Sequence, residues 1–277
     1  MGKVVHRRMR LFVLSMILAG SLPAAEPPPS ARTELSLLAT GTVSIDAGGN
    51  VTAHQLDQPG KLPPAVTELV GGKIRDWKFA VDGGKPVTVP MTLRIVAHPI
   101  DKDHYQVGIE GASFEPMRPD RGNELAPPEY PNTLARRGVG GIVYLTLHVS
   151  PDGSVAQSSV DQVNLTTVGE EGQMRTWRYT FGLAAKRRSM GWHFATQDWP
   201  LKPGQSFHSV RVPVQFVAPG QSLKDYGQWE AYIPGPRTKA PWLLGDSGLF
   251  GGNALADGQM AVLGSGPRLL TQPEQSF

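Results

Sequence analysis

Cysteine is absent from the chain, which excludes disulfide bonds, thiolate metal sites and a cysteine nucleophile. The seven histidines do not cluster at metal-ligand spacing, so the sequence indicates no zinc site either. We expect no metal and no cofactor, and we interpret the protein as non-enzymatic.

Long hydrophobic runs are also lacking. The apolar run from Leu11 to about Leu22 is shorter than the roughly 20 residues that span a bilayer. It follows four basic residues and is followed by small residues up to Ala25, which is the pattern of a secretory signal. We therefore expect residues 1–25 to be cleaved and the protein to be periplasmic. The alternative is an inner-membrane anchor through residues 11–22, and only in that case do we expect membrane contact.

A strong charge of one sign is missing as well. Four of the 27 lysines and arginines lie in the signal segment, so the rest of the chain carries 23 basic against 24 acidic residues. This balance gives no electrostatic support for nucleic-acid binding. We expect no nucleic-acid partner.

Glycine and proline are abundant, with 32 and 25 residues, and they divide the chain into segments. Two of these segments show the same order of elements. We expect a signal peptide at 1–25, a short Pro-rich linker at 26–39, a first repeat at 40–114, a second linker at 115–126, a second repeat at 127–217 and a flexible tail at 218–277.

Each repeat begins with a strand and a glycine turn. In "TGTVSIDAGGNV" (40–51) and "GGIVYLTLHVSPDGSV" (140–155), apolar and polar residues alternate up to a turn, which predicts a β-hairpin. Farther on, "VTVPMTL" (87–93) and "VRVPVQF" (210–216) share a strand pattern that includes a proline. In the first repeat, "HYQVGIEGASF" (104–114) predicts one further hairpin that extends the sheet.

A helix and an aromatic pair lie between these strands. "WKF" (77–79) follows the first helix, and its counterpart is either "WRY" (177–179) or "WHF" (192–194). We favour "WHF" because Trp177 lies inside the helical pattern of the second repeat. The apolar positions at helical spacing are Val66, Leu69, Val70, Ile74 and Trp77 in the first repeat, and Met174, Trp177, Phe181, Ala184 and Ala185 in the second.

The stretch "PPEYPNTLARRGVGGIVYLTLHVSPDGSV" (127–155) resembles the start of the C-terminal domain of TonB-type energy transducers. The likeness rests on Tyr130-Pro131, the Leu-Ala pair that follows, the glycine before the strand and the Asp-Gly turn. The aromatic pair Trp192/Phe194 and "VRVPVQF" continue it, so that it covers residues 127–217. Residues 40–96 look like a second, degenerate copy that lacks the Tyr-Pro opening.

The resemblance implies an α+β fold of two small domains, each an antiparallel sheet packed on one or two helices. It also implies that the last strand is an exposed edge that accepts the TonB box, an extended peptide of an outer-membrane receptor. Pro213 agrees with this, because proline cannot donate to a β-ladder and is confined to edges and bulges. The predicted peptide-binding residues are Val210, Arg211, Val212, Pro213, Val214, Gln215 and Phe216, with Tyr130 and Pro131 beside them. For Tyr130-Pro131 an equal alternative is that it fixes the start of a short helix.

The chain departs from a full energy transducer in its short, cleavable apolar run and in its spacer of about 15 residues, which reaches at most ~50 Å. The polar residues that precede Tyr-Pro in the family are replaced by Pro127, Pro128 and Glu129. We therefore expect a TonB-like periplasmic protein that binds a partner peptide by strand addition and is associated with TonB-dependent transport. The alternative is a structural envelope module that binds cell wall or self-associates, for example as a homodimer.

"GDSG" (245–248) copies the nucleophile turn of chymotrypsin-like serine proteases and makes a serine hydrolase using Ser247 the remote alternative. That chemistry needs a histidine base, a buried Asp and a rigid oxyanion hole. No histidine follows Ser247, and its surroundings are rich in glycine. We therefore predict no catalytic residue.

Overall fold

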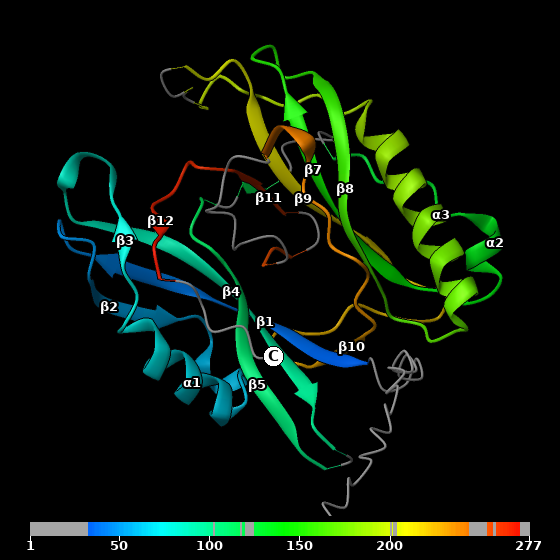
Figure 1. Cartoon of the computed structure of the whole chain (residues 1–277), viewed down its shortest axis with the longest axis horizontal. Coiled ribbons are helices and arrows are strands. Elements are labelled where there is room, and N and C mark those ends of the chain that lie inside the picture. Colours follow the sequence, from blue (N-terminus) through cyan, green and yellow to red (C-terminus); the bar gives the residue numbers. More distant parts are fainter. Residues whose placement is uncertain are drawn as a thin grey trace, which may run out of the picture.

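The computed structural model describes residues 33–101, 103–116, 118–119, 125–199, 201, 204–243, 254–256 and 259–271. The expected signal peptide and Ser247 lie outside the described residues. The fold is α+β with antiparallel sheets, as the sequence predicts. In chain order the elements are β1 (Glu34–Ile45), β2 (Val51–Leu56), η2 (Pro59–Lys61), α1 (Pro64–Ile74), β3 (Phe79–Ala80), η3 (Asp82–Gly84), β4 (Val87–Pro99), β5 (Tyr105–Ser113), β6 (Arg118–Pro119), α2 (Asn132–Ala135), β7 (Gly141–Val149), β8 (Val155–Leu165), α3 (Glu171–Ser189), β9 (His208–Phe216), β10 (Glu230–Tyr232), η4 (Pro241–Leu243), β11 (Gln259–Val262) and β12 (Arg268–Leu269) (Figure 1).

The first sheet is built around β1. On one side β1 pairs with β4 over nearly its whole length, and on the other it pairs with β10 at its start and with β2 at its end. β5 extends the sheet beyond β4. The apolar positions of α1 pack into the core of this sheet, where Val66, Val70 and Ile74 are buried. The helical spacing therefore predicted the correct face of α1. It was wrong in extending the helix to Trp77, which is buried but lies after the end of α1 at Ile74.

β1 begins earlier than the sequence predicts. Leu37 and Ala39 are buried and alternate with less buried neighbours, so the strand already has its two-residue period before residue 40. The expected linker 26–39 is therefore wrong from Glu34 on.

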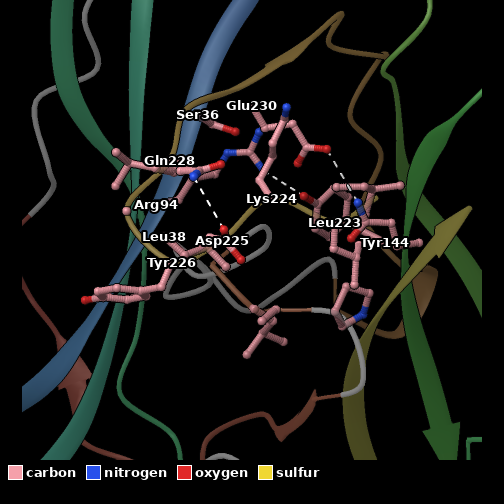
Figure 2. A pocket seen from close by; sticks show the side chains of 17 residues that line it. Ser36, Leu38, Arg94, Tyr144, Leu223, Lys224, Asp225, Tyr226, Gln228 and Glu230 are labelled. Carbon is pink, nitrogen blue, oxygen red and sulfur yellow. Dashed lines mark hydrogen bonds between the residues drawn. The ribbon is translucent and has the colours of Figure 1, made fainter. Parts of the chain in front are cut away.

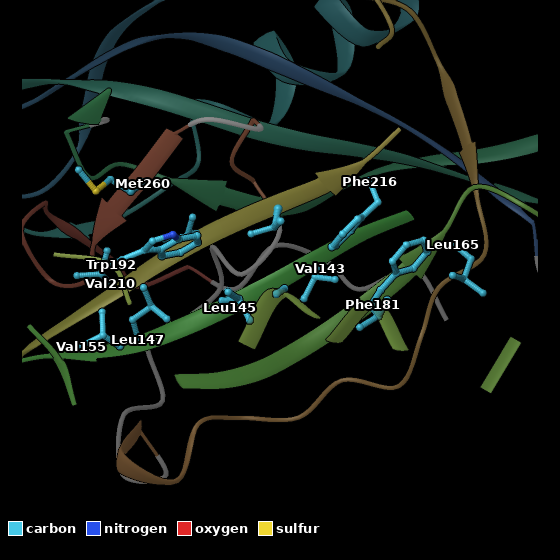
Figure 3. Close-up of a cluster of buried hydrophobic side chains, with 14 of the residues drawn as sticks. Val143, Leu145, Leu147, Val155, Leu165, Phe181, Trp192, Val210, Phe216 and Met260 are labelled. Atoms are coloured by element: carbon cyan, nitrogen blue, oxygen red, sulfur yellow. The ribbon is translucent and has the colours of Figure 1, made fainter. Parts of the chain in front are cut away.

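The second sheet has the strand order β6-β11-β9-β7-β8, and α3 packs on its apolar face (Figures 1 and 3). The Phe181 ring of α3 stacks on that of Phe216 in β9, with 4.4 Å between the ring centroids. A capping box formed by Glu170 and Gln173 starts the helix, because each side chain bonds the backbone N–H of the other residue. Met174, Trp177 and Ala185 are buried beside Phe181, which confirms the predicted helical face.

The two halves of the chain share one hairpin and one backbone hydrogen bond that ties a buried phenylalanine to the turn of that hairpin, a contact we call the aromatic bridge. In each turn a glycine has positive φ, 81° at Gly49 and 93° at Gly153. The carbonyl of each glycine accepts a hydrogen bond, from the N–H of Phe79 in the first half and from the N–H of Phe194 in the second, both at 2.9 Å. Phe194 is thus the counterpart of Phe79. This confirms the choice of "WHF" over "WRY".

The two prolines, in contrast, do not occupy equivalent positions. Val87 lies opposite Ile45 beside the first turn, and His208 lies opposite Val149 beside the second. Pro90 lies three residues after Val87, whereas Pro213 lies five residues after His208. The shared V-x-V-P pattern is therefore out of register by two residues, and the structural counterpart of Pro213 is Thr92.

The tail adds one strand to each of the two larger sheets and forms a small two-stranded sheet with β3. β10 adds to β1, β11 pairs with β9 and β6, and β12 pairs with β3. Its apolar side chains Tyr232, Ile233, Leu243 and Met260 are buried. The expected flexible tail 218–277 is therefore wrong for its described residues. The expected linker 115–126 likewise contributes a paired strand, β6.

Candidate functional site

The predicted binding strand, β9, pairs with β7 along its whole length. Val210, Val212, Val214 and Phe216 are buried in the core beneath α3. The N–H of Leu263 donates to the Ser209 carbonyl at 2.8 Å, on the side of β9 away from β7. Since antiparallel hydrogen bonds alternate along a strand, the backbone of Pro213 also faces that side. A proline is tolerated there because its missing N–H would not bond to β7.

The tail covers the start of this edge. β11 pairs with β9 through Val262 opposite Val210 and Ala261 opposite Arg211. The expected exposed edge along 210–217 is therefore wrong at Val210 and Arg211, because a distant part of the chain supplies their neighbouring strand. The paired stretch of β11 ends at Arg211, and Val212–Phe216 lies beyond it.

The Arg211 side chain has a structural role on the opposite face of the sheet from α3. It is 6% exposed, and its Nη2 lies 3.7 Å from Oδ2 of Asp161. The Thr146 hydroxyl donates to the same carboxylate. Burial raises the pKa of Asp161, while the bond from Thr146 and the charge of Arg211 oppose that rise. Arg211 is thus engaged within the protein rather than presented to a ligand.

A cavity of about 160 Å³ borders the remaining stretch of β9. Besides Val212–Phe216, its lining residues are Leu125, Pro127, Pro128, Tyr130 and Trp192. The Tyr130 hydroxyl donates to the Val139 carbonyl, and the Trp192 indole N–H donates to the Ala126 carbonyl at 2.9 Å. Both polar groups of these aromatic walls are therefore satisfied within the protein, which leaves mainly apolar surface facing the cavity.

Tyr130 and Pro131 combine the two roles that the sequence left open. The Pro131 carbonyl accepts hydrogen bonds from Leu134 and Ala135, so this residue starts α2. The Tyr130 ring meets Phe181 and Phe216 edge-on, at 5.8 and 5.5 Å between centroids. Burial raises the pKa of Tyr130. Pro131 thus starts the helix, whereas Tyr130 lines the cavity.

A second cavity, of about 310 Å³, lies between the two sheets (Figure 2). Arg94 is 4% exposed, donates to the Tyr144 hydroxyl at 2.7 Å and lies 4.6 Å from the centroid of the Tyr232 ring. The half-buried Glu230 accepts a long hydrogen bond from Gln215 at 3.5 Å. Burial raises the pKa of Glu230, and the charges of Arg94 and Lys224 oppose the shift.

Pro213 and Gln215 line both cavities, which therefore meet at the second part of β9. Arg94, Glu230 and the wall formed by Leu125, Pro127 and Pro128 were not predicted from the sequence. Arg94 does carry a sequence signal, because it is the only Lys, Arg, Asp or Glu within β4. Nothing local marks Glu230, since its position depends on the pairing of β10 with β1.

The first half of the chain shows what can lie beside this stretch. Through the shared turn, Thr92–Ile95 of β4 corresponds to Pro213–Phe216 of β9. β5 pairs antiparallel with Thr92–Ile95, placing Ser113 opposite Thr92 and Ile109 opposite Ile95. Among the described residues of the second half, no strand pairs with Pro213–Phe216 on that side.

No family model, curated protein or solved structure matched the chain in the three comparisons. Within the described ranges, no group of three or more His, Asp or Glu side chains is placed to hold a metal ion. None of the helices described is both long and apolar enough to cross a membrane.

Proposed function

We propose that the protein binds an extended peptide by antiparallel β-strand addition to β9 at Pro213–Phe216. The observation that carries the proposal is the comparison of the two halves. β5 occupies the corresponding place beside β4, and in the described residues no strand does so beside β9. β5 therefore illustrates how an antiparallel strand can lie beside such an edge.

The surroundings of this stretch support a peptide ligand. The Pro213 carbonyl faces the edge and can accept a hydrogen bond from an added strand. The cavity beside it is walled by Tyr130 and Trp192, so an apolar side chain of the peptide would be removed from water there. Binding thus combines a backbone contact with side-chain burial.

The role that fits this binding mode is that of a TonB-like, non-catalytic protein of the cell envelope. The resemblance over residues 127–217 suggests the TonB box of an outer-membrane receptor as the partner, and the signal-like N-terminus suggests the periplasm as the location. With its short spacer, the protein would modulate TonB-dependent transport rather than drive it.

Hydrogen exchange of the purified chain, measured by mass spectrometry with and without TonB-box peptides, tests the proposal. Peptide binding should slow exchange in the segment that contains Pro213–Phe216. Pro127→Trp, which fills the cavity from its exposed rim, should weaken binding, whereas Glu129→Trp on the neighbouring surface should not. Absence of protection at saturating peptide would refute the proposal. Protection that depends on protein concentration without peptide would indicate self-association instead.

A further inference from the structure

The two cavities at β9 lie on opposite faces of its sheet. Val212 and Val214 point toward the α3 side, where Tyr130 and Trp192 wall the smaller cavity. The inter-sheet cavity lies on the other face, beside Tyr144 (Figure 2). Successive side chains of an added strand point alternately to the two faces. A peptide at this edge would therefore send one side chain into each cavity from neighbouring positions.

The smaller cavity selects an apolar side chain. Its volume of about 160 Å³ is close to that of an apolar protein cavity of roughly 150 Å³ that takes up benzene. Tyr130 and Trp192 already donate their polar hydrogens to backbone carbonyls. A buried polar side chain would therefore lose its bonds to water without full replacement.

The inter-sheet cavity has different chemistry, because its charges compensate one another. Arg94 and Glu230 line its interior, and Lys224 and Asp225 stand at its exposed rim. An additional charge would break this balance in a partly buried site, which is costly. A primary amide is neutral and provides both a donor for Glu230 and an acceptor for the cationic side chains.

We infer that the peptide carries an apolar side chain followed or preceded directly by glutamine or asparagine, with the amide in the inter-sheet cavity. This inference rests on the proposed strand addition and defines its side-chain specificity. Glu230 and Arg94 are the specificity-determining residues, while the backbone of β9 supplies affinity that does not depend on sequence.

Short synthetic peptides that differ at one position test the inference. Each has a leucine followed by Gln, Glu or Lys within an otherwise constant Thr/Val strand, and binding is measured by fluorescence anisotropy on the full chain. The Gln peptide should bind about tenfold more tightly than the Glu and Lys peptides, the scale of one hydrogen bond to a charged group. Glu230→Gln removes one negative charge from the lining of the cavity, so preference should shift toward the Glu peptide. Asp225→Asn at the exposed rim is the matched control and should change the ranking little.

The outcomes separate the inference from the function on which it rests. If no peptide protects Pro213–Phe216 from hydrogen exchange, the proposed strand addition fails. If all three peptides protect this segment and bind equally, strand addition stands and the amide specificity is overturned. If the Gln peptide is preferred but Glu230→Gln leaves the ranking unchanged, the assignment of the amide to the inter-sheet cavity is overturned.

Discussion

Replacing Gly153 by alanine tests whether the aromatic bridge of the second half is structurally necessary. Gly153 has φ of 93°, and a Cβ there would lie 2.1 Å from the Phe194 carbonyl oxygen. The backbone conformation alone costs about 1–2 kcal/mol for an L-residue. Relieving the clash moves Phe194, which is 1% exposed, and losing a buried phenyl ring costs about 3–5 kcal/mol. Because the ring moves only partly, the two costs together should lower the free energy of unfolding by about 3–5 kcal/mol.

Gly138→Ala is the matched control, because Gly138 also has positive φ, 62°, but no atom within 4 Å of the added Cβ. It should cost only about 1–2 kcal/mol. Urea unfolding followed by tryptophan fluorescence measures both variants. Gly49→Ala should match Gly153→Ala, because its Cβ would lie 2.0 Å from the Phe79 carbonyl oxygen. If Gly153→Ala costs no more than Gly138→Ala, the necessity of the bridge is refuted.

Two further substitutions address the inter-sheet cavity. Burial raises the pKa of Glu230, so its protonated form favours folding and this stabilisation is lost as pH rises through the folded pKa. Glu230→Gln should therefore raise the urea midpoint at pH 7. The gain should shrink as pH falls through the folded pKa of Glu230 and vanish below about pH 4, near the pKa of an unfolded glutamate. A pH-independent difference would contradict this. Tyr144→Phe removes the hydroxyl that accepts from buried Arg94 and should cost about 1–3 kcal/mol in urea unfolding. Tyr179→Phe, at a side chain that is 71% exposed, should be neutral, and an equal loss in both variants would argue against the Arg94 contact.

Local patterns in the sequence predicted most of the elements. The 3.6-residue period of Met174, Trp177 and Phe181 identified the buried face of α3, and the two glycine turns identified the hairpins. The choice of Trp192 over Trp177 also followed from periodicity. These features depend on residues close together in the chain, so local sequence determines them.

The rest depends on pairing between distant segments. β10 and β11 are short strands in a Gly- and Pro-rich tail, and no period marks them before their partners are known. For the same reason the sequence placed an exposed edge at Val210 and Arg211, where β11 lies. The shared proline pattern predicted the wrong alignment of the two repeats, because the registers of β4 and β9 are set by their turns rather than by Pro90 and Pro213.

The placement of β10, β11 and β12 also has a kinetic consequence. β1 starts at Glu34, yet its partner β10 ends at Tyr232, and β3 pairs with residues as late as Leu269. A chain emerging from the ribosome cannot complete the first sheet before Tyr232, the second before Val262, or the β3–β12 pair before Leu269. Until then, unpaired strand edges remain open to other chains. Folding should accordingly be slow for the protein's size, as expected when many contacts join distant residues.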